Sequence, residues 1–199
     1  MQFINDGLSG DCLISTTEGL IRIDNLLEEP FQLYSTNGNI DMRYVENVCP
    51  AFKTGEQNIY CLTTESGFEL KVTGDHLIKT RRGNIKAKDL NSLDIILFGE
   101  VSSGYVNLEI NNIISANYTE LSEEGICFKD EIFQLGSENI SIILSKIFDF
   151  YSIVTSDEII LTSEHSTFIK QIQLLLMIFK IKSSIKFTSS GSLTYGTLK

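Results

Sequence analysis

Residues 58–80, NIYCLTTESGFELKVTGDHLIKT, contain two runs of alternating apolar and polar side chains on either side of a glycine-containing turn. The runs cover 59–64 and 68–72, a pattern typical of a β-hairpin. Thr73 and His76 follow directly, before the next apolar pair. The pattern therefore predicts a hydroxyl and an imidazole at the point where one strand ends and the next begins, where we expect a functional site.

Short runs of the same kind recur through the first hundred residues, separated by turn-forming Gly and Asn residues. This spacing is typical of antiparallel β structure. The pattern of apolar and polar residues changes near residue 100. Residues 99–117 are weakly patterned and rich in Ser and Asn, as in a boundary or loop. The additional strands predicted before that boundary are 12–16, 20–23, 31–35, 40–48, 77–80 and 95–98.

The second half mixes helical and strand patterns. Apolar residues in 141–150 predict a helix after a cap at Ser137, and 163–180 has the clearest helical periodicity of the chain, with Ser163 as a candidate cap. Strands are expected at 158–162 and 183–187, and 188–199 has the composition of turns. The predicted fold class is thus mostly β with antiparallel strands, followed by a small α/β region.

Charge and hydropathy exclude several classes of function. The net charge is −10, and it is spread evenly, because 1–99 carries fourteen acids and nine bases and 100–199 carries twelve and seven. Neither half offers the basic surface that nucleic-acid binding needs. No run of eighteen apolar residues and no secretory leader occurs, so we expect a cytoplasmic protein without a membrane partner.

The cysteines and histidines do not suggest a metal or cofactor site. His76 and His165 are isolated, and no Cys-x-x-Cys pair occurs. Apart from Cys12, the cysteines are expected to be small buried apolar residues; these are Cys49, Cys61 and Cys127. We therefore expect no cofactor.

Two blocks of the chain resemble the Hint domain of inteins, the self-splicing protein elements. Gly67, Thr73 and His76, followed by 88–97, resemble the second Hint block, and 8–26 (LSGDCLISTTEGLIRIDNL) resembles the opening block. The two blocks occur in the family order. The resemblance implies a horseshoe of antiparallel strands over 7–99, a host-protein (extein) flank at 1–6, and a catalytic role for Thr73 and His76 in activating the peptide bond that enters residue 7.

The register of the opening block places Gly7 at the position of the splicing nucleophile. Aligning Leu8-Ser9-Gly10-Asp11 with the family pattern puts Cys12 where a threonine is usual. Glycine has no side chain to attack the carbonyl of Asp6, so we expect the first splicing step to be absent. In an alternative register Cys12 is itself the nucleophile, but only six residues would then separate it from Gly19.

The second half resembles a LAGLIDADG homing endonuclease, an enzyme often inserted in inteins. Residues 128–152 look like the segment leading through its second signature helix, but Lys146 replaces the small packing residue and Tyr151 replaces the metal-binding acid. Asp149 keeps an earlier acid of the motif. No first signature helix is found between 99 and 128, so 100–199 is interpreted as a degenerate endonuclease remnant without DNA cleavage.

No His-Asn splicing block occurs before Lys199. The chain is therefore expected to be the N-terminal part of a split intein, a truncated intein or a fragment of a longer protein, with a C-terminal intein fragment as candidate partner. The Leu-Ser-Gly-Asp opening resembles inteins of ribonucleotide reductases. The alternative hypothesis is a non-catalytic β-rich interaction module in which Thr73 and His76 only pack.

Overall fold

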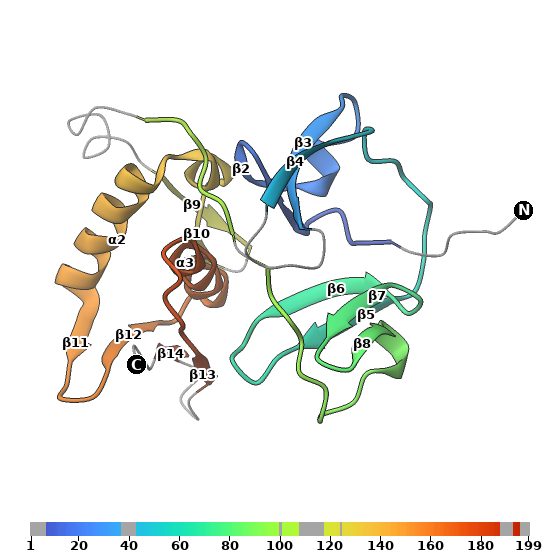
Figure 1. Cartoon of the computed structure of the whole chain (residues 1–199). Coiled ribbons are helices and arrows are strands. Elements are labelled where there is room, and N and C mark those ends of the chain that lie inside the picture. The colour runs from blue at the N-terminus through green and yellow to red at the C-terminus, as the bar shows by residue number, and fades with distance from the viewer. Residues whose placement is uncertain are drawn as a thin grey trace, which may run out of the picture. The chain divides into compact units, whose positions relative to one another are not determined.

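The computed structural model describes residues 7–36, 43–99, 101–107, 118–123, 125–187 and 193–195. The chain divides into two compact units, whose parts can be followed by colour in Figure 1. Unit 1 comprises Met1–Thr16, Ile21–Thr64 and Glu69–Gly99. Unit 2 comprises Glu100–Lys199 together with two short turns, Thr17–Leu20 and Glu65–Phe68.

Unit 1 is built from antiparallel strands. Strands β1 to β4 form one sheet in the order β2-β1-β3-β4, while β5 pairs with β6 and β7 pairs with β8 in two-stranded sheets. The 3-10 turns η1 (Ile23–Asn25) and η2 (Ala87–Asp89) follow β2 and β8. The strands are β1 (Leu13–Thr16), β2 (Gly19–Arg22), β3 (Phe31–Thr36), β4 (Arg43–Val48), β5 (Ile59–Thr63), β6 (Glu69–Thr73), β7 (Leu77–Thr80) and β8 (Gly83–Lys86).

Two hairpins share one local feature, a hydroxyl residue followed three positions later by glycine. Gly83 and Gly125 both have positive φ, 110° and 101°, a conformation that glycine adopts without steric conflict. Thr80 and Ser122 each donate a hydrogen bond from the side-chain oxygen to the carbonyl of that glycine, at 2.8 Å. This is the hairpin type in which a left-handed glycine closes a tight turn.

The core beneath β5 to β8 is small. Val72 is fully buried, and Ile78 and Ala87 are 6% and 3% exposed. Partly buried apolar residues surround these three, namely Leu8, Leu62, Leu70, Leu90 and Ile96. Val72 precedes Thr73, and Ile78 follows His76 by two residues, so the core anchors the chain on both sides of the predicted site.

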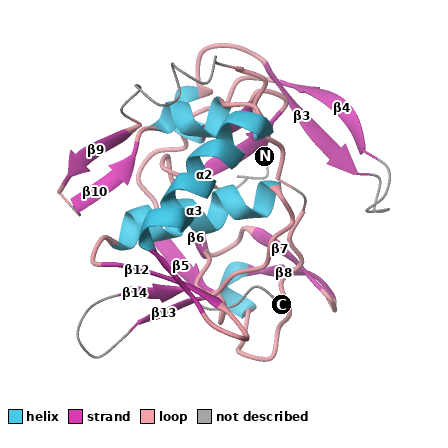
Figure 2. Cartoon of the chain, turned by 90° about the vertical axis from the view of Figure 1, so that its left-hand side faces the viewer, coloured by secondary structure: helices cyan, strands magenta, loops and turns pink. Residues whose placement is uncertain are grey.

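Unit 2 contains the α-helices α2 (Ser137–Tyr151) and α3 (Ser166–Ile178), which contact each other and β12. Figure 2 shows the two helices next to each other and near strand β12. A four-stranded sheet has the order β11-β12-β14-β13, and β9 pairs with β10. The strands are β9 (Thr119–Ser122), β10 (Gly125–Phe128), β11 (Ser152–Val154), β12 (Ile159–Ser163), β13 (Ile185–Phe187) and β14 (Leu193–Tyr195); η3 spans Asp130–Gln134.

Gln173 is a buried polar residue in the core of unit 2, with 1% of its surface exposed. Its Nε2 donates to the carbonyl oxygens of Ser66 at 2.8 Å and Ser183 at 3.2 Å. The Ser66 carbonyl also accepts from the N–H of Ile185 at 3.0 Å. One side-chain amide thus satisfies two loop carbonyls within a core that otherwise consists of residues such as Phe133, Ile140, Leu161, Ile169 and Leu175.

The expectation of a mostly β chain with antiparallel sheets is confirmed, and the helices occur in unit 2. Four local expectations are wrong. The expected strand 95–98 is reduced to a bridge between Ile96 and Thr80, and the turn-rich end contains β14. Helix α3 begins at Ser166 after His165, and Gly136 precedes α2, without a side-chain capping bond at either helix. Among the described residues, no helix is long and apolar enough to cross a membrane.

We expect Gln173→Leu to lower the free energy of unfolding by about 1–3 kcal/mol, because the part-buried carbonyl of Ser183 loses its donor. Chemical denaturation followed by circular dichroism measures this change. The control is Gln32→Leu, which removes an exposed bond to Asn47 and should change stability by less than about 0.5 kcal/mol. Equal effects of the two substitutions would contradict the structural role given to Gln173.

Candidate functional site

The segment that begins at Gly7 pairs with the end of strand β6. The N–H of Thr73 donates to the Gly7 carbonyl at 3.0 Å, Leu8 forms an antiparallel bridge with Val72, and the N–H of Ser9 donates to the Lys71 carbonyl at 3.0 Å. These contacts add the segment to β6 as a further antiparallel partner. The register places Gly7 directly opposite Thr73.

The Thr73 side chain contacts the backbone nitrogen of residue 7. Gly7 N–H donates a hydrogen bond to Thr73 Oγ1 at 2.9 Å, and Thr73 is 6% exposed. This nitrogen belongs to the peptide bond between Asp6 and Gly7. A buried hydroxyl at this distance can orient that amide, and it can exchange a proton with the nitrogen if the bond is cleaved.

His76 is placed by the turn that follows Thr73. Its N–H donates to the Thr73 carbonyl at 3.1 Å, and its carbonyl accepts from the N–H of Ala87 at 2.8 Å. The Gly74 carbonyl accepts from the N–H of Lys88 at 3.0 Å. A Cβ at position 74 would lie 2.9 Å from Cε2 of the Tyr60 ring, so a larger residue there would require this half-exposed ring to shift. Several backbone hydrogen bonds therefore fix the main chain that carries the Thr73 and His76 side chains.

Asp75 lies between these residues and carries the strongest electrostatic contacts of the turn. Its Oδ1 is 2.8 Å from Lys86 Nζ and 2.9 Å from Lys88 Nζ. Hydrogen bonds from Lys86 and then Lys88 lower the pKa of the Asp75 carboxyl from 3.8 to about 2. Because the carboxylate is exposed, water screens these ion pairs, and they contribute more to the turn's geometry than to global stability.

Position 7 has room for a side chain. A Cβ built there would lie 3.4 Å from Thr73 Cγ2 and 3.7 Å from Thr54 Oγ1, both ordinary contact distances. The φ angle of Gly7 is also outside the left-handed region that favours glycine. Local packing therefore does not require glycine at position 7. The lack of a side chain there comes from the sequence and not from a steric need.

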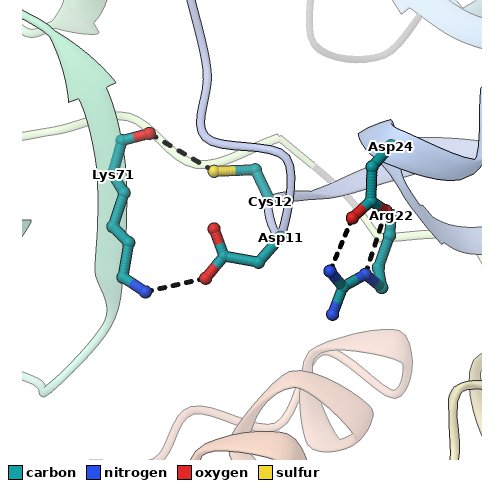
Figure 3. A network of polar contacts seen from close by, with 5 residues as sticks. All are labelled: Asp11, Cys12, Arg22, Asp24 and Lys71. Atoms are coloured by element: carbon teal, nitrogen blue, oxygen red, sulfur yellow. Dashed lines mark hydrogen bonds and ion pairs between the residues drawn. The ribbon is translucent and has the colours of Figure 1, made fainter. Parts of the chain in front are cut away.

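Cys12 is held by a different part of β6. Figure 3 shows its Sγ donating to the Lys71 carbonyl, at 3.4 Å, while Lys71 Nζ is paired with Asp11 Oδ2 at 2.7 Å. Burial raises the pKa of the Cys12 thiol, which keeps it in the protonated, less nucleophilic form. The thiol thus contacts the residue opposite Ser9, whereas the amide of Gly7 contacts Thr73.

The other predicted positions lie elsewhere. Cys127 is buried as expected, but Cys49 and Cys61 are exposed, so that expectation is wrong for both, and Cys61 lies on the exposed side of β5. Asp149 and Tyr151 lie at the end of α2, with Tyr151 70% exposed. Within the described part of the chain, no group of three His, Cys, Asp or Glu residues is arranged to hold a metal ion.

Sequence reasoning did not find the polar residues that support the site. In the sequence these residues look like ordinary surface lysines, because their acidic partners are distant. Lys71 pairs with Asp11, 60 residues away. Lys86 and Lys88 both pair with Asp75, which belongs to an earlier turn. Only the alternation in β6 carries a signal, since Lys71 and Thr73 must point to the same face of a strand.

We expect the pKa of Asp75 to rise from about 2 toward 3.8 when Lys86 and Lys88 are both replaced by Met, because both hydrogen-bond donors are lost. Carbon-detected NMR titration of the carboxyl group measures this. The sign follows from a folded-state pKa below the unfolded one: the ion pairs stabilise the turn above pH 3.8, and this contribution is lost as pH falls toward 2. The control Lys79→Met, at an exposed lysine of β7, should leave the pKa of Asp75 unchanged.

No protein-family model matches the chain, and no curated protein sequence matches it. Among solved structures, a DnaB intein from Synechocystis sp. PCC 6803 matches with 28% identity and a TM-score of 0.43, over 46% of this chain and 67% of that one. A variant of the Ssp DnaB mini-intein matches with 29% identity and a TM-score of 0.42, over 46% and 63%. A mutant of that variant matches with 30% identity and a TM-score of 0.43, over 49% and 66%. The chain is thus similar to DnaB inteins over less than half of its length.

Proposed function

We propose that residues 7–99 are the N-terminal part of an intein-type Hint domain whose first splicing step has been lost. The observation that carries this proposal is the hydrogen bond from Gly7 N–H to Thr73 Oγ1 at 2.9 Å. It joins the residue expected at the nucleophile position to the threonine expected to activate its peptide bond, across 66 residues of sequence.

The lost step follows from the chemistry of position 7. In an N-to-S acyl shift, a thiol on residue 7 attacks the Asp6 carbonyl, the bond to the residue 7 nitrogen breaks, and the thiol proton ends on the released amine. The product is a thioester that an added thiol can exchange. Gly7 provides no sulfur or oxygen for this attack, and the half-buried Cys12 thiol is bonded to the Lys71 carbonyl instead.

The sheets of unit 1 support a role for further Hint strands. Large apolar side chains on these strands are exposed by 43–49%: Tyr44, Val45, Ile59, Tyr60 and Leu77. Strand edges with such side chains are templates for pairing with another segment. We infer that a C-terminal Hint piece, in the same polypeptide or a separate one, pairs here.

Unit 2 is proposed to be a remnant of a LAGLIDADG endonuclease without nuclease activity. Lys146 lies in the middle of α2, where a signature helix needs a small residue for close packing. The exposed Tyr151 stands where a carboxylate would bind the metal, and neutral tyrosine is a poor ligand for Mg²⁺. Incubation with plasmid DNA and Mg²⁺ should leave the DNA intact, and nicking by the purified chain would overturn this part of the proposal.

We expect Gly7→Cys to restore cleavage between residues 6 and 7 in the presence of dithiothreitol, because it supplies a thiol at a position where a Cβ meets only ordinary contacts with Thr73 and Thr54. Mass spectrometry should detect the loss of residues 1–6. Adding Thr73→Ala should slow cleavage about tenfold, which corresponds to ~1.4 kcal/mol of transition-state stabilisation. Gly7→Ala is the matched control that introduces a side chain without a nucleophile, and it should stay intact.

The unmodified chain should also stay intact under the same conditions. A peptide ending at Asp11 would instead identify Cys12 as the nucleophile. If Gly7→Cys folds but is not cleaved, the splicing-site proposal is wrong, and the chain is better described as a β-rich interaction module. Folding of each variant is checked by the dispersion of its NMR spectrum.

Pairing is tested by mixing the unmodified chain with a synthetic C-terminal Hint fragment that ends in His-Asn. Size-exclusion chromatography should show a complex, and the same mixture made with Gly7→Cys should yield ligated product on a gel. If neither a complex nor a ligated product forms, the proposal of a C-terminal partner is wrong. The cleavage result for position 7 is unaffected by that outcome.

A further inference from the structure

The loop between strands β4 and β5 brings a second threonine to the candidate site. Residues 49–58 form this loop and have no regular secondary structure. The loop is anchored where the N–H of Ala51 donates to the Leu26 carbonyl at 2.7 Å. Gly55 has a φ of 90°, a conformation that glycine adopts without steric conflict. Thr54 lies between these two positions, in the same unit as the candidate site.

The Thr54 hydroxyl faces the side-chain position of residue 7. A Cβ on Gly7 would lie 3.7 Å from Thr54 Oγ1 and 3.4 Å from Thr73 Cγ2. Among the described residues, and apart from the chain neighbours of Gly7, no third heavy atom lies within 4 Å of that Cβ. Thr54 Oγ1 is therefore the nearest polar group of the described chain to a side chain at this position.

The two threonines contact different parts of residue 7. Thr73 Oγ1 accepts from the Gly7 N–H at 2.9 Å, so its hydroxyl serves the backbone nitrogen, while its methyl group lies against the side-chain position. Thr54 presents its hydroxyl oxygen to that position instead. The sulfur of a thiol there is one bond further out than Cβ, so in the rotamer turned toward the loop it comes within hydrogen-bond reach of Thr54 Oγ1.

We propose that Thr54 activates the nucleophile of the candidate site, by donating a hydrogen bond from its hydroxyl to a thiolate on residue 7. This inference rests on the proposed function, and it assigns the sulfur to Thr54 and the leaving nitrogen to Thr73. A hydroxyl that donates to the charged form of a thiol favours that form, so it lowers the pKa of the thiol. The thiolate is the form that attacks a carbonyl.

Gly7→Cys is the background in which this contact is measured. Iodoacetamide labelling at a series of pH values, without dithiothreitol, gives the pKa of the new thiol. Mass spectrometry of the peptide that contains residue 7 separates this thiol from the other cysteines. Adding Thr54→Val, which replaces the hydroxyl by a methyl group, should raise that pKa by about one unit, because water competes with a hydrogen bond at an exposed residue and limits the shift. Adding Thr54→Ser, which keeps the hydroxyl, should leave the pKa at its lower value.

Cleavage with saturating dithiothreitol gives a second, kinetic readout on the same chains. A rise of one pKa unit lowers the thiolate fraction about tenfold at neutral pH, but each thiolate then reacts about threefold faster, because its nucleophilicity rises with pKa with a Brønsted slope of about 0.4–0.5. Thr54→Val should therefore make cleavage about threefold slower at neutral pH and about threefold faster at a pH above both pKa values. A loss of folding would slow cleavage at every pH.

Thr63→Val is the matched control. Thr63 is also an exposed threonine of unit 1, but it lies at the opposite end of the β5–β6 hairpin from Thr73. This substitution should change neither the thiol pKa nor the cleavage rate. In the unmodified chain, Thr54→Val should leave the hydrogen-exchange rate of the Gly7 N–H unchanged, because that group bonds to Thr73. The exchange rate thus shows whether the backbone pairing of the site is intact.

The outcomes distinguish this inference from the proposed function. The same thiol pKa with and without Thr54→Val would overturn the role of Thr54, whether or not cleavage occurs. Slower cleavage at every pH would also contradict it, because that result indicates a displaced loop and not a changed pKa. A Gly7→Cys chain that folds but is not cleaved would overturn the splicing site, and the labelling would still decide whether Thr54 contacts the thiol.

Discussion

The geometry of the candidate site depends on the antiparallel pairing of residues 7–9 with strand β6. This pairing includes two bonds between Gly7 and Thr73, one from each backbone N–H. A shift of the register by one residue would turn the Thr73 side chain to the opposite face and separate its hydroxyl from the residue 7 amide. The buried Val72, bridged to Leu8, opposes such a shift because it would have to leave the core.

The turn after β6 extends the same constraint to His76. Its backbone groups bond to Thr73 and Ala87, and Asp75 is paired with two lysines from the β8 and η2 region. Such surface ion pairs contribute little to the free energy of unfolding, but together with the backbone bonds they restrict the conformations of a short loop. The candidate site therefore has a defined backbone geometry although residue 7 carries no side chain.

The core of unit 2 includes a buried polar side chain. Its core surrounds Gln173, whose amide satisfies two loop carbonyls, so a polar residue is buried without an unpaired donor. The hydroxyl of Ser183 differs from its carbonyl, because Ser183 Oγ is buried and has no hydrogen-bond partner among the described residues, whereas the carbonyl accepts from Gln173.

The sequence by itself predicted the hairpins of unit 1, and it shows that residue 7 has no side chain. Alternation and turn glycines act within a few residues, and a missing side chain is visible without a structure. It did not predict β9, β10, β11 or β14, whose short runs lack a distinctive period. Only the tertiary structure decided that the Cys12 thiol bonds to the Lys71 carbonyl, 59 residues away, and that Gln173 bonds to the Ser66 carbonyl, 107 residues away. These contacts join segments distant in sequence, and local periodicity carries no information about which distant segments meet.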